Sequence, residues 1–285
     1  MKTRTTYVVG GVRIPFMKSM TAYRDVTTPE LMTASLKSLV ERYNLKGKVV
    51  GDVALGALMQ SSANWNFARE VVQASGLHPN TPAYNVQRAC GTSLETTIQI
   101  AHKISSYQIE SGIAGGVDSN SDLPIMVTRS FSQKLVALNS ARTLGEKLRI
   151  FLSFRPSDLK PVPPAVVEPR TGKSMGEHCE LMVKEWKISR QEQDELALAS
   201  HLNAAKAYKD GFYADLVFPF LGKSTDGIMR GDTTLEKLAK LKPAFDRSEK
   251  GTLTAGNSSS LTDGAVTVLL ASEGGAQKYN WLLLA

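Results

Sequence analysis

Cys90 is the residue whose position gives it the clearest potential for chemistry. It follows a strand-like run at 84–87 and precedes apolar residues at helical spacing, so a helix is expected to begin near Gly91 or Thr92. A thiol at a helix start meets the positive end of the helix dipole, which favours the nucleophilic thiolate. The segment alone also fits a small buried Cys without a chemical role, because free cysteine is among the most buried residue types.

Two further segments contain residue types that a binding site could use. Ser174-Met175-Gly176-Glu177 precedes an apolar helical pattern and taken alone indicates a helix start. Residues 252–265 hold many small polar residues ahead of a buried strand and taken alone indicate a turn. Neither segment is specific by itself, so their order along the chain carries the functional information.

The sequence lacks the common nucleotide and metal motifs. The glycine pairs at 10–11 and 115–116 do not form a dinucleotide fingerprint, and no P-loop is present. Among the four histidines, His178 alone neighbours a cysteine, and adjacent side chains point in different directions, so no shared metal is expected. His201 lies in a helical segment, where a packed or surface role is expected.

The composition is that of an ordinary globular protein, with 285 residues, 42% hydrophobic and 21% charged. The formal net charge of +7 is compatible with a polyanionic partner such as nucleic acid, anionic lipid or a phosphorylated cofactor. Basic residues are scattered along the chain and no nucleic-acid motif accompanies them, so nucleic acid is not an expected partner. Two cysteines, no apolar leader and no apolar run of roughly 20 residues predict a cytoplasmic protein without a transmembrane segment.

The elements that must position these residues form a recognisable order. Alternating strand and helix patterns up to residue 118 predict a helix-covered, mostly parallel sheet. Prolines and irregular backbone follow at 119–250, with one strong helix at 189–209 that opens with a Ser189 to Glu192 capping box. The sheet pattern returns at 265–271. The expected division is 1–118 with 251–285 as one domain and 119–250 as an insertion. Strands are predicted at 7–12, 53–59, 84–87, 111–117 and 265–271, and further helices at 29–43, 67–74 and 92–107.

In combination and in order, the segments resemble the thiolase family. The Cys90 segment is followed by Gly-Gly-Val-Asp-Ser at 115–119, the Met175 helix start and the Thr-Ala-Gly-Asn-Ser loop that begins at Thr254. Arg-Ile-Pro-Phe at 13–16 resembles the family's Arg-Thr-Pro-Phe segment. Leu238 to Phe245 resembles its Leu-Arg-Pro-Ala-Phe segment, and 115–124 with 142–145 look most like the fatty-acid β-oxidation members. The resemblance covers essentially the whole chain. It implies a layered αβα domain with a mixed five-stranded sheet and an inserted, mainly helical or irregular loop domain.

The resemblance implies an acyltransferase of the thiolase type. Cys90 would take the acyl group of a 3-ketoacyl-CoA as a thioester and release acetyl-CoA, and a second CoA would then accept the shortened acyl group. Met175 matches a methionine of the acyl pocket, Ser259 a serine that contacts pantetheine, and Arg230 a basic residue beside the adenine. Coenzyme A is the implied substrate, with no permanently bound cofactor and no metal. A homo-oligomer, usually a dimer, and a hydratase–dehydrogenase partner are the implied assemblies.

One departure from the family bears on activity. A whole thiolase continues with a second domain that carries Asn-Glu-Ala-Phe, Gly-His-Pro and Cys-x-Gly motifs, and none of these occurs in the 285 residues. Without a positioned histidine base, a large loss of rate is expected for a truncated chain, together with an exposed apolar patch. Two alternatives remain open: a non-catalytic truncated thiolase that binds CoA or a partner, and a condensing enzyme of the ketoacyl-synthase type. The segments around Met175 and Asn257 favour the thiolase type over the second alternative.

Overall fold

A computed structural model of the chain describes residues 3–284 and divides into two compact units. The first unit comprises 1–122 and 176–285, and the second comprises 123–175. Residues 176–250, part of the expected insertion, therefore cluster with the unit that carries the sheet. Of the helices in residues 3–284, none combines the length and the apolar composition that crossing a bilayer requires.

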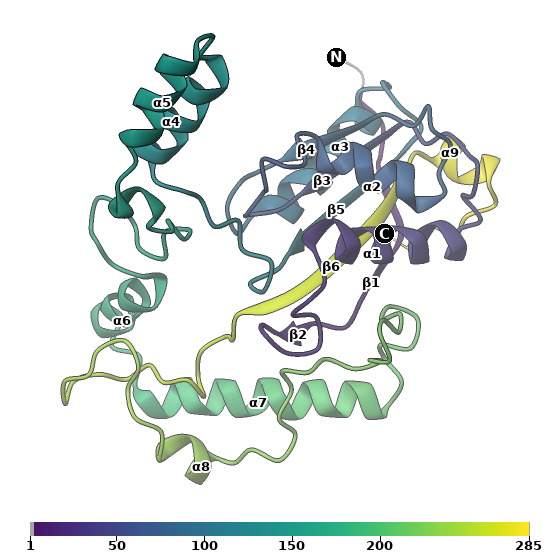
Figure 1. Cartoon of the computed structure of the whole chain (residues 1–285). Coiled ribbons are helices and arrows are strands. Elements are labelled where there is room, and N and C mark those ends of the chain that lie inside the picture. Colours follow the sequence, from purple (N-terminus) through teal and green to yellow (C-terminus); the bar gives the residue numbers. More distant parts are fainter. Residues whose placement is uncertain (1–2, 285) are drawn as a thin grey trace. The chain divides into compact units, whose positions relative to one another are not determined.

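The first unit is built on a mixed sheet (Figure 1). Its strand order is β1-β6-β5-β3-β4, and the short β2 also pairs with β6. β3 is parallel to β4 and β5, whereas β6, which comes late in the chain, lies between β1 and β5 and is antiparallel to both. The predicted α/β class and mixed sheet are confirmed, and the parallel pairing is restricted to three strands. The strands are β1 (Tyr7–Arg13), β2 (Met17–Lys18), β3 (Asp52–Gly56), β4 (Ala83–Val86), β5 (Ser111–Asp118) and β6 (Thr262–Ala271).

Helices cover both faces of this sheet, and each face has its own core. Alternate residues of β3 point to opposite sides: Val53 and Leu55 belong to one apolar cluster and Ala54 to the other. α1 (Thr28–Arg42) and α2 (Phe67–Ser75) supply the first cluster with residues such as Leu36 and Val71, and α3 (Thr92–Ser105) supplies Ile100 and Ile104 to the second. Each predicted helix is present within a few residues of its expected bounds.

The start of α3 lies unusually close to the sheet. A Cβ atom placed on Gly116 of β5 would lie 1.8 Å from Ser93 Oγ, and one on Gly56 of β3 would lie 2.1 Å from Thr92 Cγ2. Neither strand could carry a side chain at these positions without displacing the helix. The two glycines therefore determine how closely the first turn of α3 approaches β3 and β5.

The apolar residues that indicated α3 in the sequence point away from the sheet. Leu94 is 66% exposed and Ile98 is 39% exposed, whereas Thr92 and Thr96 are buried on the inner face. Threonine is tolerated there because Thr96 Oγ1 donates to the carbonyl of Gly115 at 3.2 Å. The outer face of α3 is thus an exposed apolar surface of the first unit.

The rest of the first unit holds the long helix predicted at 189–209. It begins with the predicted capping box, in which Glu192 N donates to Ser189 Oγ at 3.2 Å and Ser189 N donates to Glu192 Oε2 at 2.7 Å. The helices α6 (Met175–Glu185) and α7 (Arg190–Lys209) lie beside the loop at 252–260, as Figure 1 shows, and α8 (Leu235–Ala239) contacts α7. The short α9 (Glu273–Lys278) follows β6 and contacts that strand.

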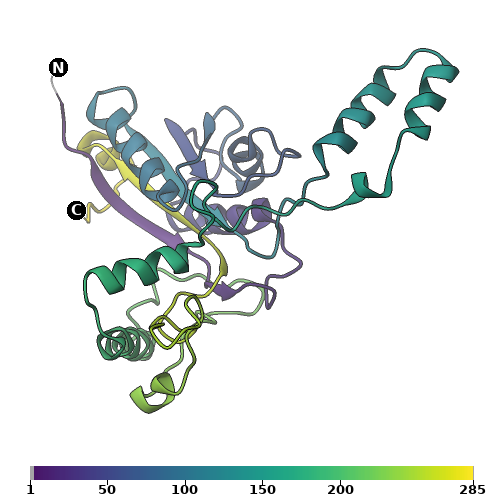
Figure 2. The same ribbon diagram turned by 90° about the vertical axis from the view of Figure 1, so that its left-hand side faces the viewer.

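The second unit contains two helices that the sequence analysis did not predict. α4 (Arg129–Ser140) and α5 (Leu144–Leu152) form a hairpin, followed by the short 3-10 helix η1 (Pro156–Leu159), and Figure 2 shows the two helices side by side. Thr143 and Glu146 form a capping box at the start of α5 that could have indicated it. Neither helix buries a residue, so their apolar pattern differs from that of a core helix.

Candidate active site

Cys90 lies on the turn between β4 and α3, with Gly91 as the N-cap of the helix. Its side chain is exposed, which rules out the interpretation of Cys90 as a buried core residue. Ala89, directly before it, has φ +46°, a left-handed conformation that is uncommon for residues other than glycine. Strained backbone of this kind is found preferentially at functional sites, where the surrounding contacts must hold it.

Hydrogen bonds from Thr92 hold this turn. Thr92 Oγ1 accepts from Arg88 N at 2.8 Å and donates to Ala89 O at 2.7 Å, and Gly91 N donates to Arg88 O at 3.0 Å. No side chain caps α3, and within residues 3–284 the backbone N–H of Cys90 has no protein acceptor. A free N–H beside a nucleophile can stabilise a developing oxyanion.

A cavity of about 180 Å³ opens beside the first turn of α3. Ser93, Phe16 and Gly264 line it, together with the carboxyl end of β5 at Asp118. Burial raises the pKa of the Asp118 carboxyl, although Leu58 N donates to it at 2.9 Å. The cavity therefore combines an aromatic wall with a carboxyl group whose ionised form is disfavoured.

A larger cavity of about 350 Å³ lies between α7 and the loop at 256–260. Ser259, one of the predicted binding residues, lines it. His201 lines it as well, and His201 Nδ1 accepts from the backbone N of Arg230 at 3.3 Å. Ser259 thus lines the cavity, whereas Arg230 is not among its lining residues and reaches it only through this backbone contact with His201. A packed or surface role was expected for His201, and in the structure this residue lines the cavity.

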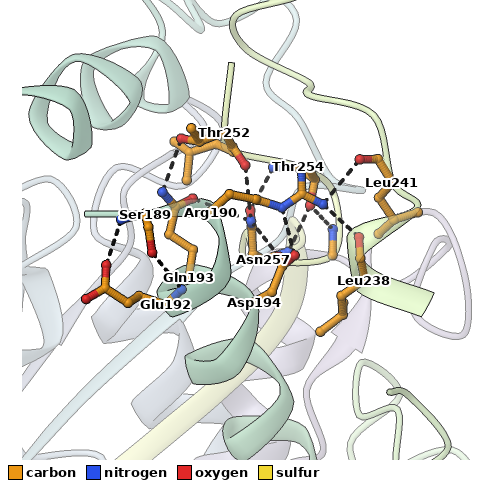
Figure 3. Close-up of polar contacts among 12 residues, drawn as sticks. Ser189, Arg190, Glu192, Gln193, Asp194, Leu238, Leu241, Thr252, Thr254 and Asn257 are labelled. Atoms are coloured by element: carbon orange, nitrogen blue, oxygen red, sulfur yellow. Dashed lines mark hydrogen bonds and ion pairs between the residues drawn. The ribbon is translucent and has the colours of Figure 1, made fainter. Parts of the chain in front are cut away.

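The loop that carries Ser259 is anchored on α7 through Asn257 (Figure 3). Asn257 Nδ2 donates to Asp194 Oδ1 at 2.9 Å, and Asn257 Oδ1 accepts from Thr254 N at 2.7 Å. Gln193 Nε2 adds a bond to Thr252 Oγ1 at 3.1 Å. Thr254 and Asp194 are buried, so these bonds are shielded from water. The hydrogen bonds of the Thr-Ala-Gly-Asn segment therefore fix the position of the loop that carries Ser259.

Two charged side chains complete the anchoring. Glu180 of α6 accepts from Leu253 N and from Thr252 N, each at 2.9 Å. Burial alone would raise the pKa of Glu180, but these donors outweigh it and the pKa lies below its ordinary value. Arg190 Nε donates to Asp194 Oδ2 at 2.8 Å, which compensates the buried charge of Asp194.

Arg13 connects the walls of the two cavities. Its guanidinium forms two hydrogen bonds with Asp226, at 2.6 and 2.8 Å, and lies 4.6 Å from the ring centroid of Phe16. Asp226 lines the larger cavity and Phe16 the smaller one, and Phe16 N donates to Asp226 Oδ1 at 2.7 Å. Burial opposes ionisation of Asp226, but the bonds from Arg13 and Phe16 lower its pKa. Sequence reasoning singled out Arg13 but not Asp226, because no local pattern relates residues so far apart.

The remaining predicted site residue, Met175, is the first residue of α6 and is 64% exposed. It belongs to the second unit, and neither Met175 nor Cys90 is among the residues that line the two cavities described above. Among residues 3–284 there is no group of three or more His, Cys, Asp and Glu side chains that could hold a metal ion.

These features define an α/β protein with an exposed cysteine on a strand-to-helix turn and an anchored polar loop beside a cavity. Residues 6–274 match the family profile described as thiolase, N-terminal domain. Because this match covers most of the chain, the chain belongs to the thiolase family, as its motifs predicted.

Relatives and solved structures agree with this assignment. A 3-ketoacyl-CoA thiolase of Photobacterium profundum is 42% identical over 277 residues, which are 95% of this chain and 63% of that protein. One from Citrobacter koseri is 41% identical over 280 residues, with the same coverage. The Bacillus anthracis acetyl-CoA acetyltransferase superposes with a TM-score of 0.83 at 29% identity, covering 99% of this chain and 69% of that one. Human mitochondrial 3-ketoacyl-CoA thiolase in complex with CoA gives 0.80 at 27% identity, covering 98% and 68%. The chain thus spans about 63% of the length of the curated relatives.

Proposed function

We propose that this chain carries the nucleophile and the CoA-binding surface of a thiolase-type acyltransferase. The observation that carries the proposal is the exposed position of Cys90 on a braced turn at the start of α3. In the proposed reaction, the Cys90 thiolate attacks the keto carbon of a 3-ketoacyl-CoA. The bond between the keto carbon and the carbon next to the CoA thioester carbonyl breaks. The released carbanion takes a proton to become acetyl-CoA, and the acyl group stays on sulfur as a thioester.

The second half of the reaction needs a CoA thiol to attack that thioester, which returns Cys90 to its free form. We propose that the cavity between α7 and the loop at 256–260 binds part of the CoA molecule, with Ser259 at the pantetheine arm and Arg230 at the adenine. A guanidinium suits that role because it can stack on a ring and also donate hydrogen bonds. The human relative crystallised in complex with CoA supports this choice of substrate. Met175 is proposed as a contact of the acyl chain, which its flexible thioether suits.

The protons of this reaction require a base, which the family supplies from Gly-His-Pro and Cys-x-Gly motifs that do not occur in these 285 residues. We therefore propose that the chain forms or accepts the acyl-thioester but turns over poorly by itself. The alternative is a thiolase-fold chain that binds CoA without any acyl transfer. A condensing enzyme of the ketoacyl-synthase type is less favoured, because the relatives at about 42% identity are 3-ketoacyl-CoA thiolases.

Selective alkylation tests the role of Cys90, and the chain contains its own reference thiol. Cys179 in α6 is only partly exposed and is not part of the proposed site. Iodoacetamide labelling followed by peptide mass spectrometry should show Cys90 reacting at least about tenfold faster than Cys179, because the reactive thiol is exposed at a helix start. Saturating acetyl-CoA should protect Cys90 and leave Cys179 unchanged. Equal rates for both thiols without protection would refute the proposal.

The remaining proposals rest on the family resemblance and on the composition of the chain. We propose a homodimer, as is usual in the family, and a cytoplasmic location consistent with two unpaired thiols. A hydratase–dehydrogenase partner is proposed from the β-oxidation character of the motifs. We also propose that residues 1–118 and 251–285 form one domain and that residues 119–250 are an insertion in it. The return of the chain to the sheet at β6, after residue 250, supports this division. Light scattering of the purified chain tests the oligomeric state.

A further inference from the structure

The loop at 57–66 connects β3 to α2 and contacts the strand that leads to Cys90. Its beginning is held by the end of β5, because Leu58 N donates to Asp118 Oδ1 at 2.9 Å. Its last residue, Asn66, is the N-cap of α2 and bonds to the first turn of that helix. Both ends of the loop are therefore fixed within the first unit, so a side chain from its middle has a defined place from which to act.

Gln60 is the side chain that reaches from this loop to β4. Gln60 Nε2 donates to Val86 O at 3.1 Å, and Gln60 Oε1 accepts from Asn85 Nδ2 at 3.3 Å. Asn85 Nδ2 also donates to Trp65 O at 3.1 Å, and Asn85 Oδ1 accepts from Ala68 N at 3.0 Å. The two amides thus join the loop and the start of α2 to the last two residues of β4.

The amide of Gln60 continues the pairing of β3 and β4 beyond their last backbone pair. The parallel ladder ends with Gly56 opposite Val86. Gln60 Nε2 donates to the carbonyl of Ala57 at 3.4 Å as well as to that of Val86, so it bridges the ends of the two strands. Val86 is buried, and a buried carbonyl needs a donor. The end of β4 is therefore held by a side chain from another segment.

The turn that carries Cys90 begins directly after Val86 and needs support on both sides. On the helix side, Thr92 Oγ1 accepts from Arg88 N and donates to Ala89 O. On the strand side, Gln60 holds the residue from which the turn departs. The left-handed conformation of Ala89, with φ +46°, is maintained only if these surrounding contacts fix it.

We propose that Gln60 is a positioning residue for Cys90, whose amide keeps the end of β4 and the following turn in the geometry that acyl transfer requires. The inference rests on the acyl transfer proposed above, and Gln60 acts through Val86 and not on the acyl group itself. Transfer to sulfur depends on the alignment of the thiolate and of the Cys90 N–H with the reacting carbonyl. A displacement of about 1 Å in such an arrangement can slow a reaction about a hundredfold.

Acetylation of Cys90 by acetyl-CoA tests the proposal. The Cys90 thiolate attacks the acetyl carbon, the bond from that carbon to the CoA sulfur breaks, and CoA leaves as a thiolate that takes up the proton given up by Cys90. The full chain is compared with Gln60→Met, which keeps the side-chain length and neutral charge but neither donates to Val86 O nor accepts from Asn85. Mass spectrometry of the Cys90 peptide gives the rate at several acetyl-CoA concentrations.

We expect the maximal rate of acetylation to fall about tenfold in Gln60→Met. The acetyl-CoA concentration that gives half the maximal rate should change by less than about twofold, because the cavity beside Ser259 does not include Gln60. Hydrogen exchange of the amides at 87–91 should be faster in the variant. Loss of the fold would instead change both kinetic quantities and the exchange of the whole chain.

The matched control is Gln277→Met, which makes the same chemical change on an exposed position of α9 and should behave like the unmodified chain. Circular dichroism checks the fold of each variant. If Gln60→Met does not fold, Gln60→Asn replaces it, since this variant keeps the amide but shortens its reach by one methylene.

Equal maximal rates for the unmodified chain and a folded Gln60 variant would overturn the inference and leave the proposed function standing. If acetyl-CoA acetylates Cys90 in none of the chains, the proposed function fails. Hydrogen exchange then decides the inference alone, and unchanged exchange at 87–91 in the Gln60 variant would overturn it.

Discussion

Replacing Asn257 with alanine tests whether the loop at 252–260 depends on a single amide for its position. The change removes the acceptor of the Thr254 N–H and the donor to Asp194, at 2.7 and 2.9 Å, and both partners are buried. A hydrogen bond to a charged group contributes about 1.5–3 kcal/mol, and a buried N–H without a partner costs about 1–3 kcal/mol. Asp194 keeps its bond to Arg190, so the lower part of these ranges applies and a loss of about 3 kcal/mol is expected.

The measurement is the free energy of unfolding from urea titration, combined with hydrogen exchange of the loop amides at 252–260. Asn203→Ala is the matched control, because it makes the same chemical change on an exposed position of α7. Asn257→Ala should unfold at lower urea and exchange its loop amides faster, and CoA should protect Cys90 less well. If the two variants unfold at the same urea concentration, the account of the loop is wrong.

Four further substitutions, one of them a control, test other contacts. Glu180→Gln should destabilise the chain at pH 7. The pKa of Glu180 is lowered in the folded chain, so its carboxylate contributes stability that is lost as pH falls through that pKa. The difference in urea midpoint between the unmodified chain and Glu180→Gln should therefore shrink below about pH 4. Asp226→Asn breaks the largely buried pair with Arg13 and should cost about 2–3 kcal/mol in thermal unfolding, and an unchanged melting temperature would contradict this. Gly116→Ala should destabilise the chain and change the alkylation rate of Cys90, whereas Gly145→Ala, with open space around it, should stabilise α5 by about 0.5–1 kcal/mol. Equal effects of the two alanine variants on Cys90 would be inconsistent with close packing of α3.

Local signals in the sequence predicted most of the first unit. The Ser189 to Glu192 capping box located α7, and the continuous apolar run located β6, because both patterns arise from neighbouring residues. The orientation of α3 was not predictable in the same way. Its apolar residues, such as Leu94, face outward, and the inner face uses threonines that fit only because Gly56 and Gly116 allow close approach.

Contacts between distant segments were beyond sequence reasoning on a single chain. The pairing of Arg13 with Asp226 depends on the fold that brings β1 beside the segment before residue 230, and no periodicity encodes it. The helices α4 and α5 were missed for another reason. Their apolar side chains remain exposed, so a search for core-forming patterns assigned their segment to irregular backbone.

The helix α7 anchors the loop and also forms one wall of the larger cavity. Gln193 contacts both, and Ser200 and Ala204 continue the wall along the same helix. A rigid helix used in both ways keeps the shape of the cavity when it is empty, so a ligand loses little free energy to ordering the protein. The wall from residue 193 to 204 extends about 16 Å at 1.5 Å per residue. A ligand longer than this extends beyond the part of the cavity that α7 lines, as a CoA molecule that reaches Cys90 from this cavity would have to do.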